Sequence, residues 1–269
     1  MRYFYSVAIA LFFSSTVNAI QEDFVEERTI RDIALGGITI GTNSIISIAG
    51  NRDTSTQFQI AYRNKFAMKE MSVGSLVGVF SSSFMTNAVS LFSAGYDDYR
   101  QTLFSLHGQK SLFEFFNLGV SLHHSSVSAV TLEKNIWCLY PKIGVEYAMR
   151  NAWRLGVTID NPVRIYSDKD YPLDKEFRIE AGVSYRLGEV LMIAGEYNYT
   201  DGASDCFRLG GEFAFIPTFK VRIGVVSRPF SPCFGCGYIL RQWTLDLSSE
   251  QHRYLGNSLS LGLSYHFKR

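Results

Sequence analysis

The sequence predicts an all-β fold, an antiparallel transmembrane β-barrel of about 14 strands. Three observations carry this prediction. Apolar and polar residues alternate with a period of two in many consecutive segments, these segments are about ten residues long, and short and long connections alternate between them. The chain contains no apolar run of about 18 or more residues, which excludes membrane-spanning helices.

The first residues of the chain have the features of a secretory signal peptide. Arg2 supplies a basic start, an apolar stretch runs from Tyr3 to Phe13, and Val17-Asn18-Ala19 precedes an acidic segment. A buried N-terminal helix is the alternative interpretation. We expect cleavage after Ala19. The expected divisions are residues 1–19 as signal peptide, residues 20–53 as an N-terminal plug or periplasmic segment, and residues 54–269 as an outer-membrane β-barrel.

The charge of the mature chain argues against one class of partner. The full chain has 26 Lys and Arg against 25 Asp and Glu, and removal of Arg2 leaves 25 of each. A neutral chain has no electrostatic reason to bind nucleic acid. No linker rich in Pro, Ser or Gly interrupts the mature chain, so we expect a single domain.

The segment 177–187 shows the alternation most clearly. Phe177, Val183 and Leu187 fall on one face of a strand, and Arg178 and Ser184 fall on the other, so the strand has an apolar side and a wet side. Two early segments, 73–80 and 88–96, alternate less cleanly. We expect strands at residues 57–66, 72–82, 88–96, 99–107, 114–124, 136–150, 153–160, 176–187, 190–199, 206–215, 219–227, 233–239, 242–248 and 257–267.

Strand length and aromatic placement favour a membrane barrel over a soluble sandwich. Strands of about ten residues cross a bilayer when they are tilted, whereas strands of soluble sheets usually have about five or six residues. Aromatic residues gather at strand ends, as at Trp153, Tyr199 and Phe267, where the girdles at the two membrane interfaces would place them.

The connections between the expected strands alternate in length. Short gaps fall at one end of the barrel, at 151–152, 188–189, 216–218 and 240–241, and longer gaps fall at the other, at 125–135, 161–175, 200–205, 228–232 and 249–256. Bacterial outer-membrane barrels have short periplasmic turns and longer external loops. Since hydrocarbon offers no hydrogen-bond partners, a sheet spans it only when the sheet closes. We therefore expect the protein in the bacterial outer membrane, in contact with its lipids.

Charged residues on the inward-facing side of the strands are the candidate lumen-lining residues. They could line a water-filled, slightly basic path for anions or carboxylated lipids, or they could pair across neighbouring strands and close the lumen. The sequence leaves both possibilities open. These candidates are Arg154, Arg178, Glu180, Arg186, Glu196, Arg208, Glu212 and Arg222.

The chain from about Trp153 to Phe267 also resembles a known family. Segments 177–185, 207–213 and 221–225 look like the C-terminal half of the long-chain fatty-acid transporter superfamily, with the greatest likeness to PorV/PorQ-type barrels of type IX secretion. The resemblance implies about 14 strands and an N-terminal segment that plugs the lumen. In residues 34–37, Ala-Leu-Gly-Gly resembles the early glycine motif of this family, whereas its Asn-Pro-Ala triplet is absent.

Together these observations favour an outer-membrane barrel for transport or secretion that is not an enzyme. The expected partners are a hydrophobic or anionic small ligand and other envelope or secretion-system proteins. One alternative is a structural scaffold barrel with a closed lumen. Another is a lipid hydrolase in which His124 acts as base and Ser126 as nucleophile, because both fall on the lipid-facing side of one strand. No orienting Asp or Asn can be assigned to that pair.

No cofactor or metal is expected. The chain contains neither a phosphate-binding glycine loop nor an H-E-x-x-H motif. Cys233 and Cys236 have C-x-x-C spacing but lack a second pair of ligands. With Cys138 and Cys206 they allow three disulfide connectivities or free thiols, and the sequence does not choose among these.

Overall fold

The computed structural model describes residues 25–49, 55–82, 84–113, 115–149, 152–163, 165–167, 173 and 175–267. The expected signal peptide, residues 1–19, lies outside these described residues, and so do residues 20–24 and 50–53 of the expected plug segment. Within the described ranges, no helix is both long enough and apolar enough to cross a membrane.

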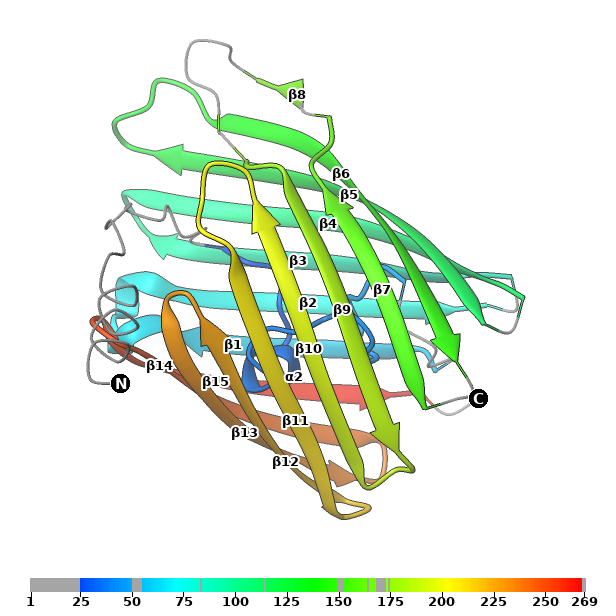
Figure 1. Ribbon diagram of the computed structural model, residues 1–269. Helices are drawn as coiled ribbons and strands as arrows, with labels where there is room; N and C mark the ends of the chain where they lie inside the picture. The colour runs from blue at the N-terminus through cyan, green and yellow to red at the C-terminus, as the bar shows by residue number, and fades with distance from the viewer. Residues whose placement is uncertain are drawn as a thin grey trace, which may run out of the picture.

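Fourteen long strands form one antiparallel sheet that closes into a barrel (Figure 1). Successive strands pair with one another, and β1 pairs with β15 to complete the ring. A short additional strand, β8, pairs with the outer end of β6, so β7 is followed around the barrel by β9. The predicted fold is confirmed. The strands are β1 (Gln57–Asn64), β2 (Ser72–Ser81), β3 (Thr86–Tyr96), β4 (Tyr99–Leu112), β5 (Phe116–Ala129), β6 (Ile136–Met149), β7 (Trp153–Asp160), β8 (Ile165–Tyr166), β9 (Arg178–Leu187), β10 (Leu191–Thr200), β11 (Cys206–Ile216), β12 (Phe219–Ser227), β13 (Phe230–Leu240), β14 (Trp243–His252) and β15 (Gly256–His266).

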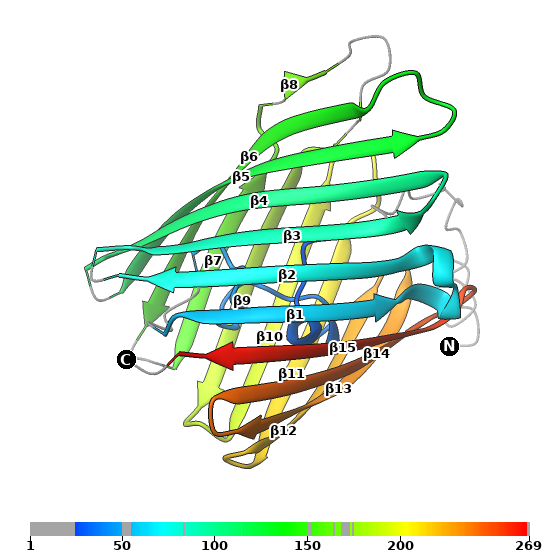
Figure 2. The same cartoon turned by 180° about the vertical axis from the view of Figure 1, so that it is seen from behind.

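The helical elements are few and short. A single α-helical turn, α2 (Ile30–Ala34), lies in the N-terminal segment, and two 3-10 turns, η1 (Lys65–Ala67) and η2 (Lys69–Met71), connect β1 to β2. In Figures 1 and 2 the N-terminal segment, drawn in blue, passes through the space that the strands enclose.

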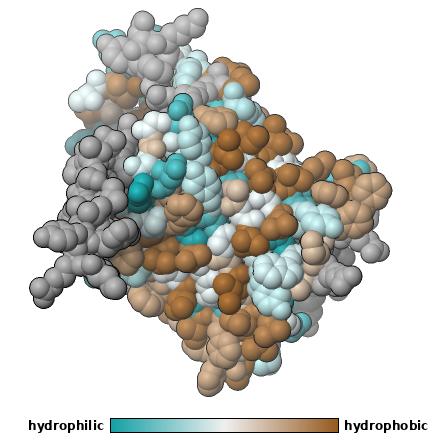
Figure 3. Space-filling view, viewed as in Figure 1, coloured by the Kyte–Doolittle hydropathy of each residue, from teal (hydrophilic) through white to brown (hydrophobic). Residues whose placement is uncertain are grey.

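The barrel wall is apolar outside and largely polar inside, as the alternation predicts. Val183 and Leu209 face outward and are 37% and 60% exposed, whereas Ser184 and Arg208 face inward and are 3% and 9% exposed. Figure 3 shows apolar residues spread over the part of the wall in view. A closed sheet with an apolar exterior is the architecture that bacterial outer-membrane proteins use to satisfy every backbone hydrogen bond in hydrocarbon. The protein therefore belongs in that membrane.

Aromatic pairs lie near both rims of the wall. Trp153 of β7 packs on Tyr185, and Trp243 of β14 packs on Tyr265, each with ring centroids 4.7 Å apart. At the opposite rim, the rings of Tyr197 and Phe207 are 5.0 Å apart. This placement matches the two interfacial girdles of membrane barrels.

The two mouths of the barrel differ in their connections. The turns after β9, β11 and β13 are short, whereas the loops after β5, β7 and β10 are longer. Both the start of β1 and the end of β15 lie at the short-turn mouth. Because outer-membrane barrels keep their short turns in the periplasm, we assign this mouth to the periplasm and call the other the external mouth.

Four strands, β4, β5, β13 and β14, extend three or more residues beyond their predicted bounds. β4 and β5 each reach 14 residues, longer than expected, and Figure 2 shows their long, paired course. The polar residues His124 and Ser126 interrupt the apolar outward face of β5 there, but the ladder continues through them, with His124 opposite Phe104.

β13 begins at Phe230, so the connection after β12 shrinks to Arg228 and Pro229. β14 runs to His252, so the connection after it shrinks to residues 253–255. The prediction of long external loops at 228–232 and 249–256 is therefore wrong, because the strand ladders continue into them.

The outward face makes a prediction about stability. Val183→Arg places a charge near the bilayer midplane and should reduce the free energy of unfolding by about 2 to 4 kcal/mol. Val130, which is 74% exposed in the loop after β5, provides the matched control. Val130→Arg should reduce the free energy of unfolding by less than about 1 kcal/mol. Reversible unfolding in lipid vesicles measures both, and equal costs would contradict the assigned facing.

Candidate functional site in the barrel lumen

Residues 25–49, which we call the luminal segment, fill the interior of the barrel. Its helical turn α2 is held by a capping box, in which Asp32 accepts hydrogen bonds from the Thr29 amide and hydroxyl at 3.1 and 2.7 Å. The Ser44 hydroxyl donates to the same carboxylate at 2.6 Å, which ties the turn to the later part of the segment. Asp32 is fully buried, and this burial raises the pKa of its carboxyl group although the hydrogen bonds act to lower it.

Glycines on the inner face of the wall let the luminal segment pack directly on the strand backbone. A Cβ atom added at Gly119 would lie 1.6 Å from the Ile48 carbonyl oxygen, and one added at Gly210 would lie 2.5 Å from the Leu35 carbonyl oxygen. Any side chain at these positions would collide with the segment. We call this set the glycine girdle, and its members are Gly119, Gly144, Gly156, Gly182, Gly210, Gly224, Gly235 and Gly262.

The glycine girdle was not predicted from the sequence. Its signal was present, because glycine recurs at the inward-facing position near the middle of successive strands. Ile40 shows the consequence, since its side chain occupies the space that a Cβ atom at Gly156 or Gly182 would take.

Carboxylates of the wall accept hydrogen bonds from the backbone of the luminal segment. Glu196 accepts from the Thr39 and Ile40 amides at 3.1 and 3.3 Å, and Glu146 accepts from the Gly41 amide at 3.0 Å. These bonds satisfy amides that have no secondary-structure partner, since residues 38 and 39 have no regular structure and residues 40–42 lie in a turn. The wall therefore supplies the polar partners as well as the packing surface of the segment.

An ion pair also joins the segment to the wall. Arg31 reaches Glu212 at 2.9 Å, and Arg222 reaches the same carboxylate at 2.7 Å. Arg222 continues to Asp246 at 2.5 Å. Three charged side chains of the wall and one of the segment thus share a single buried network.

The remaining lumen-lining candidates also lie inside the barrel, each among polar neighbours. Arg208 lies 2.8 Å from Glu196, and Glu180 lies 2.7 Å from Lys142. Arg154 approaches Glu146 to 4.0 Å. The Arg186 guanidinium donates to the Met192 sulfur at 3.5 Å, and Arg178 lines two cavities at the external side.

A second cluster fixes the beginning of the luminal segment. Glu27 lies 2.9 Å from Nε2 of His107 and 3.4 Å from Nδ1 of His123, and Ser90 donates to it. His123 also shares hydrogen bonds with Ser105 and Ser121, at 2.9 and 2.6 Å. Burial acts to raise the pKa of Glu27, but the two histidines and the hydrogen bonds outweigh it, so the pKa lies below its ordinary value.

The proposed hydrolase pair lies elsewhere on the same strand. His124 and Ser126 occupy the outward-facing side of β5, and the His124 ring stacks on Trp137 with centroids 5.7 Å apart. The structure therefore surrounds His123, not His124, with serine hydroxyls and a carboxylate. Neither Ser105 nor Ser121 of that cluster is more than 1% exposed.

The cysteines and the possible metal-ligating side chains do not form a common site in the described residues. The four cysteines, all of which lie in described strands, form no disulfide with one another. Cys138 and Cys233 are buried, whereas Cys206 and Cys236 are partly exposed. In the part of the chain that the structure describes, no three His, Cys, Asp or Glu side chains converge as metal ligands.

Two polar cavities lie beside the start of the luminal segment. The larger, which we call the external cavity, has a volume of about 130 Å³ and opens among the ends of β1, β10, β11 and β14. Its charged lining residues are Glu26, Arg28, Arg63, Lys65, Glu176, Arg178, Arg208, Arg228 and Glu250.

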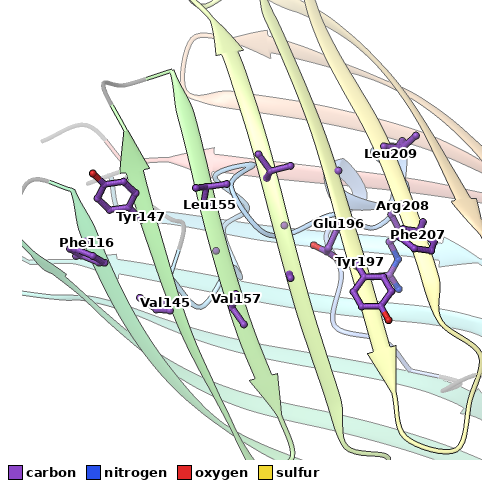
Figure 4. Close-up of a pocket in the computed structure, with 15 residues that line it drawn as sticks. Phe116, Val145, Tyr147, Leu155, Val157, Glu196, Tyr197, Phe207, Arg208 and Leu209 are labelled. Atoms are coloured by element: carbon purple, nitrogen blue, oxygen red, sulfur yellow. Dashed lines mark hydrogen bonds and ion pairs between the residues drawn. The ribbon is translucent and has the colours of Figure 1, made fainter.

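An apolar groove of about 810 Å³ lies on the outer wall across β7, β9, β10 and β11 (Figure 4). The groove is lined by residues with small or no side chains, Gly182, Gly195 and Ala181. Larger apolar residues such as Leu155 and Phe207 also line it. Because Gly182 also lacks a side chain on the inner face, only the backbone separates this groove from the luminal segment. The groove faces lipid, whereas the polar cavities lie inside the barrel, and Arg208 lines both the groove and the external cavity.

The contacts of Asp32 make a prediction about the luminal segment. Asp32→Ala removes the helix cap and the bond to Ser44, which should destabilise the folded segment by about 2 kcal/mol. Trypsin cleavage at Arg28 and Arg31 should then become roughly 30-fold faster. Asp201→Ala, in the exposed turn after β10, should leave cleavage at those two sites unchanged. Resistance of the Asp32 variant equal to that of the parent would contradict the role of these bonds.

The comparisons with known proteins show the fold. No protein-family model and no curated protein sequence matches the chain. Among solved structures, it is similar to the toluene transporter TbuX of Ralstonia pickettii, with 10% identity and a TM-score of 0.68 over 88% of this chain and 97% of that chain. The toluene transporter TodX of Pseudomonas putida is similar over 88% of this chain and 98% of its own, with 10% identity and a TM-score of 0.68.

A FadL homologue of Pseudomonas aeruginosa is similar over 91% of this chain and 99% of its own, with 10% identity and a TM-score of 0.64. At these identities the likeness establishes a shared fold. The chain thus has the barrel architecture of FadL- and TodX-type outer-membrane transporters.

Proposed function

We propose that the protein is an outer-membrane transport barrel whose lumen is gated by the luminal segment. The observation that carries this proposal is the direct packing of residues 25–49 on the glycine girdle, which fills the lumen with a separate piece of chain. The shared fold supports it, because the similar structures are described as a toluene transporter and a monoaromatic hydrocarbon channel.

The luminal segment is held mostly by contacts that can be exchanged. Its backbone amides bond to Glu146 and Glu196, and its Arg31 pairs with Glu212. Hydrogen bonds of this kind contribute about 1 kcal/mol each in net terms, because water or a polar ligand can replace either partner. When the segment moves, these carboxylates and Arg154, Arg178, Arg186 and Arg222 become the lining of the path.

The cargo class that we propose is a small hydrophobic molecule or an amphipathic anion. A hydrophobic cargo is suggested by the proteins that share the fold. An anionic head group would find arginines along the whole inner face, from Arg178 near the external mouth to Arg186 near the periplasmic one. We propose no catalytic role.

A secretion-associated or scaffold barrel is the second candidate. It is favoured by the pairing of the luminal charges, since Arg222, Arg208 and Lys142 each have a carboxylate within 2.8 Å. A barrel closed in this way could hold envelope or type IX secretion proteins at its surface without passing a solute. Copurification of such partners from the outer membrane would favour this candidate over transport.

Displacement of the segment provides the test. Gly210→Leu should expel residues near Leu35 from the girdle, because a Cβ atom already comes within 2.5 Å of the Leu35 carbonyl oxygen. In planar bilayers the parent protein should be silent and the variant should show discrete open-channel steps. Gly74→Leu is the matched control, because a Cβ atom there meets nothing within 4 Å. It should be as silent as the parent.

Two readouts separate the possible outcomes. Trypsin cleavage at Arg31 reports whether the segment has left the girdle, and the gel shift of unboiled protein reports whether the barrel is intact. An intact barrel that has released its segment and still conducts no ions would overturn the transport proposal.

A further inference from the structure

The external cavity collects basic side chains from separate parts of the chain. Six of its lining residues are Lys or Arg and three are Glu. The basic residues come from the luminal segment, β1, η1, β9, β11 and the turn after β12. The basic residues therefore do not belong to a single charged strand. Together they place an excess of positive charge at the external mouth.

A carboxylate of the protein already occupies this cavity. Glu26, at the start of the luminal segment, lies 3.0 Å from Nε of Arg28. The charges of Lys65, Arg208 and Arg63 act on the same carboxylate and hold its pKa below the ordinary value, against the opposing effect of burial. Glu26 thus lies among four basic side chains, of which Arg63 also pairs with Glu250 and Arg208 also pairs with Glu196.

One of the surrounding cations, Arg63, has a donor that lacks an acceptor in the described parts of the chain. Arg63 pairs with Glu250 through Nη2, and its side chain is only 13% exposed. Its Nε is buried and has no acceptor among the described residues. A buried N–H group without an acceptor is costly, so this atom favours an additional oxygen in the cavity. Hydroxyl groups of Thr200, Ser204 and Ser231 line the same space.

We propose that Arg28, Arg63, Lys65 and Arg208 form an oxyanion site for a phosphate monoester group that arrives from outside the cell, with Glu26 as a built-in competitor. A phosphate monoester carries close to two negative charges and three acceptor oxygens. It therefore compensates the excess positive charge of the cavity, which six cations and three carboxylates line, better than the single charge of Glu26 does. The planar guanidinium groups present the paired donors that phosphate oxygens accept.

This site goes beyond the transport proposal and does not depend on it. Binding at the external mouth requires only the cavity and its cations, whether or not a solute then passes. Phosphate binding and ion conductance are measured separately, so the failure of one proposal leaves the other intact.

Calorimetric titration of the full-length protein with inorganic phosphate tests the site. The titration is run in neutral detergent at about pH 8, with chloride of equal ionic strength as the reference. Glu26→Gln should bind phosphate about tenfold more tightly, because the internal competitor loses its charge. The double variant Arg63→Gln/Lys65→Gln should bind at least about tenfold more weakly.

Arg253→Gln is the matched control, because Arg253 is an exposed cation at the same mouth that does not line the cavity. Its affinity should equal that of the parent. Gel migration of unboiled samples shows whether each variant forms a barrel. If the double variant does not, Arg228→Gln in the exposed turn after β12 replaces it, with a smaller loss of affinity expected.

A second arm distinguishes the source of the phosphate. It repeats the titration with short-chain phosphatidic acid in the micelle. Binding of this lipid alone, with the same dependence on Glu26 and Arg63, would assign the site to a lipid head group, whereas binding of free phosphate would assign it to a soluble monoester. Binding of neither, or phosphate binding that is the same in all variants, would overturn the proposal.

Discussion

The contact between the luminal segment and the glycine girdle is the constraint on which the rest of the interior depends. A β-barrel of this size encloses a space that the side chains of its own wall do not fill. Here glycines remove the inward side chains at one level, and Leu35, Ile40 and Ile48 of the segment take their place. Interiors are packed nearly as densely as crystals, so even a methyl group at Gly119 or Gly224 would force the segment to move.

The electrostatics of the lumen follow from this packing. Carboxylates that would otherwise face an empty, water-filled lumen are covered by the segment and must find partners. Glu196 and Glu146 find backbone amides, whereas Glu212 finds Arg31 and Arg222. Buried pairs of this kind add little net stability, but leaving one partner unpaired is costly. These pairs therefore determine the position of the segment but add little to the free energy that holds it there. A gate needs both properties.

The barrel could be predicted from the sequence because alternation with period two is a local property. Segment 177–187 shows its facing without knowledge of any other strand. β2 and β3 are harder, because their inward residues Val77, Val79 and Phe92 are also apolar and pack against Val25 and Ile46. The site was largely beyond prediction, because its contacts join residues far apart in the chain. Gly41 and Glu146, for example, meet only once the register of every strand between them is set.

Hydrogen exchange of the Thr39, Ile40 and Gly41 amides in lipid nanodiscs tests most directly whether the segment fills the lumen. In the structure these amides bond to Glu196 and Glu146 inside the barrel. We expect them to exchange orders of magnitude more slowly than an unstructured peptide, because exchange requires the segment to leave the girdle. Exchange at the rate of an unstructured peptide would contradict this expectation and would mean that the lumen stands open in the membrane.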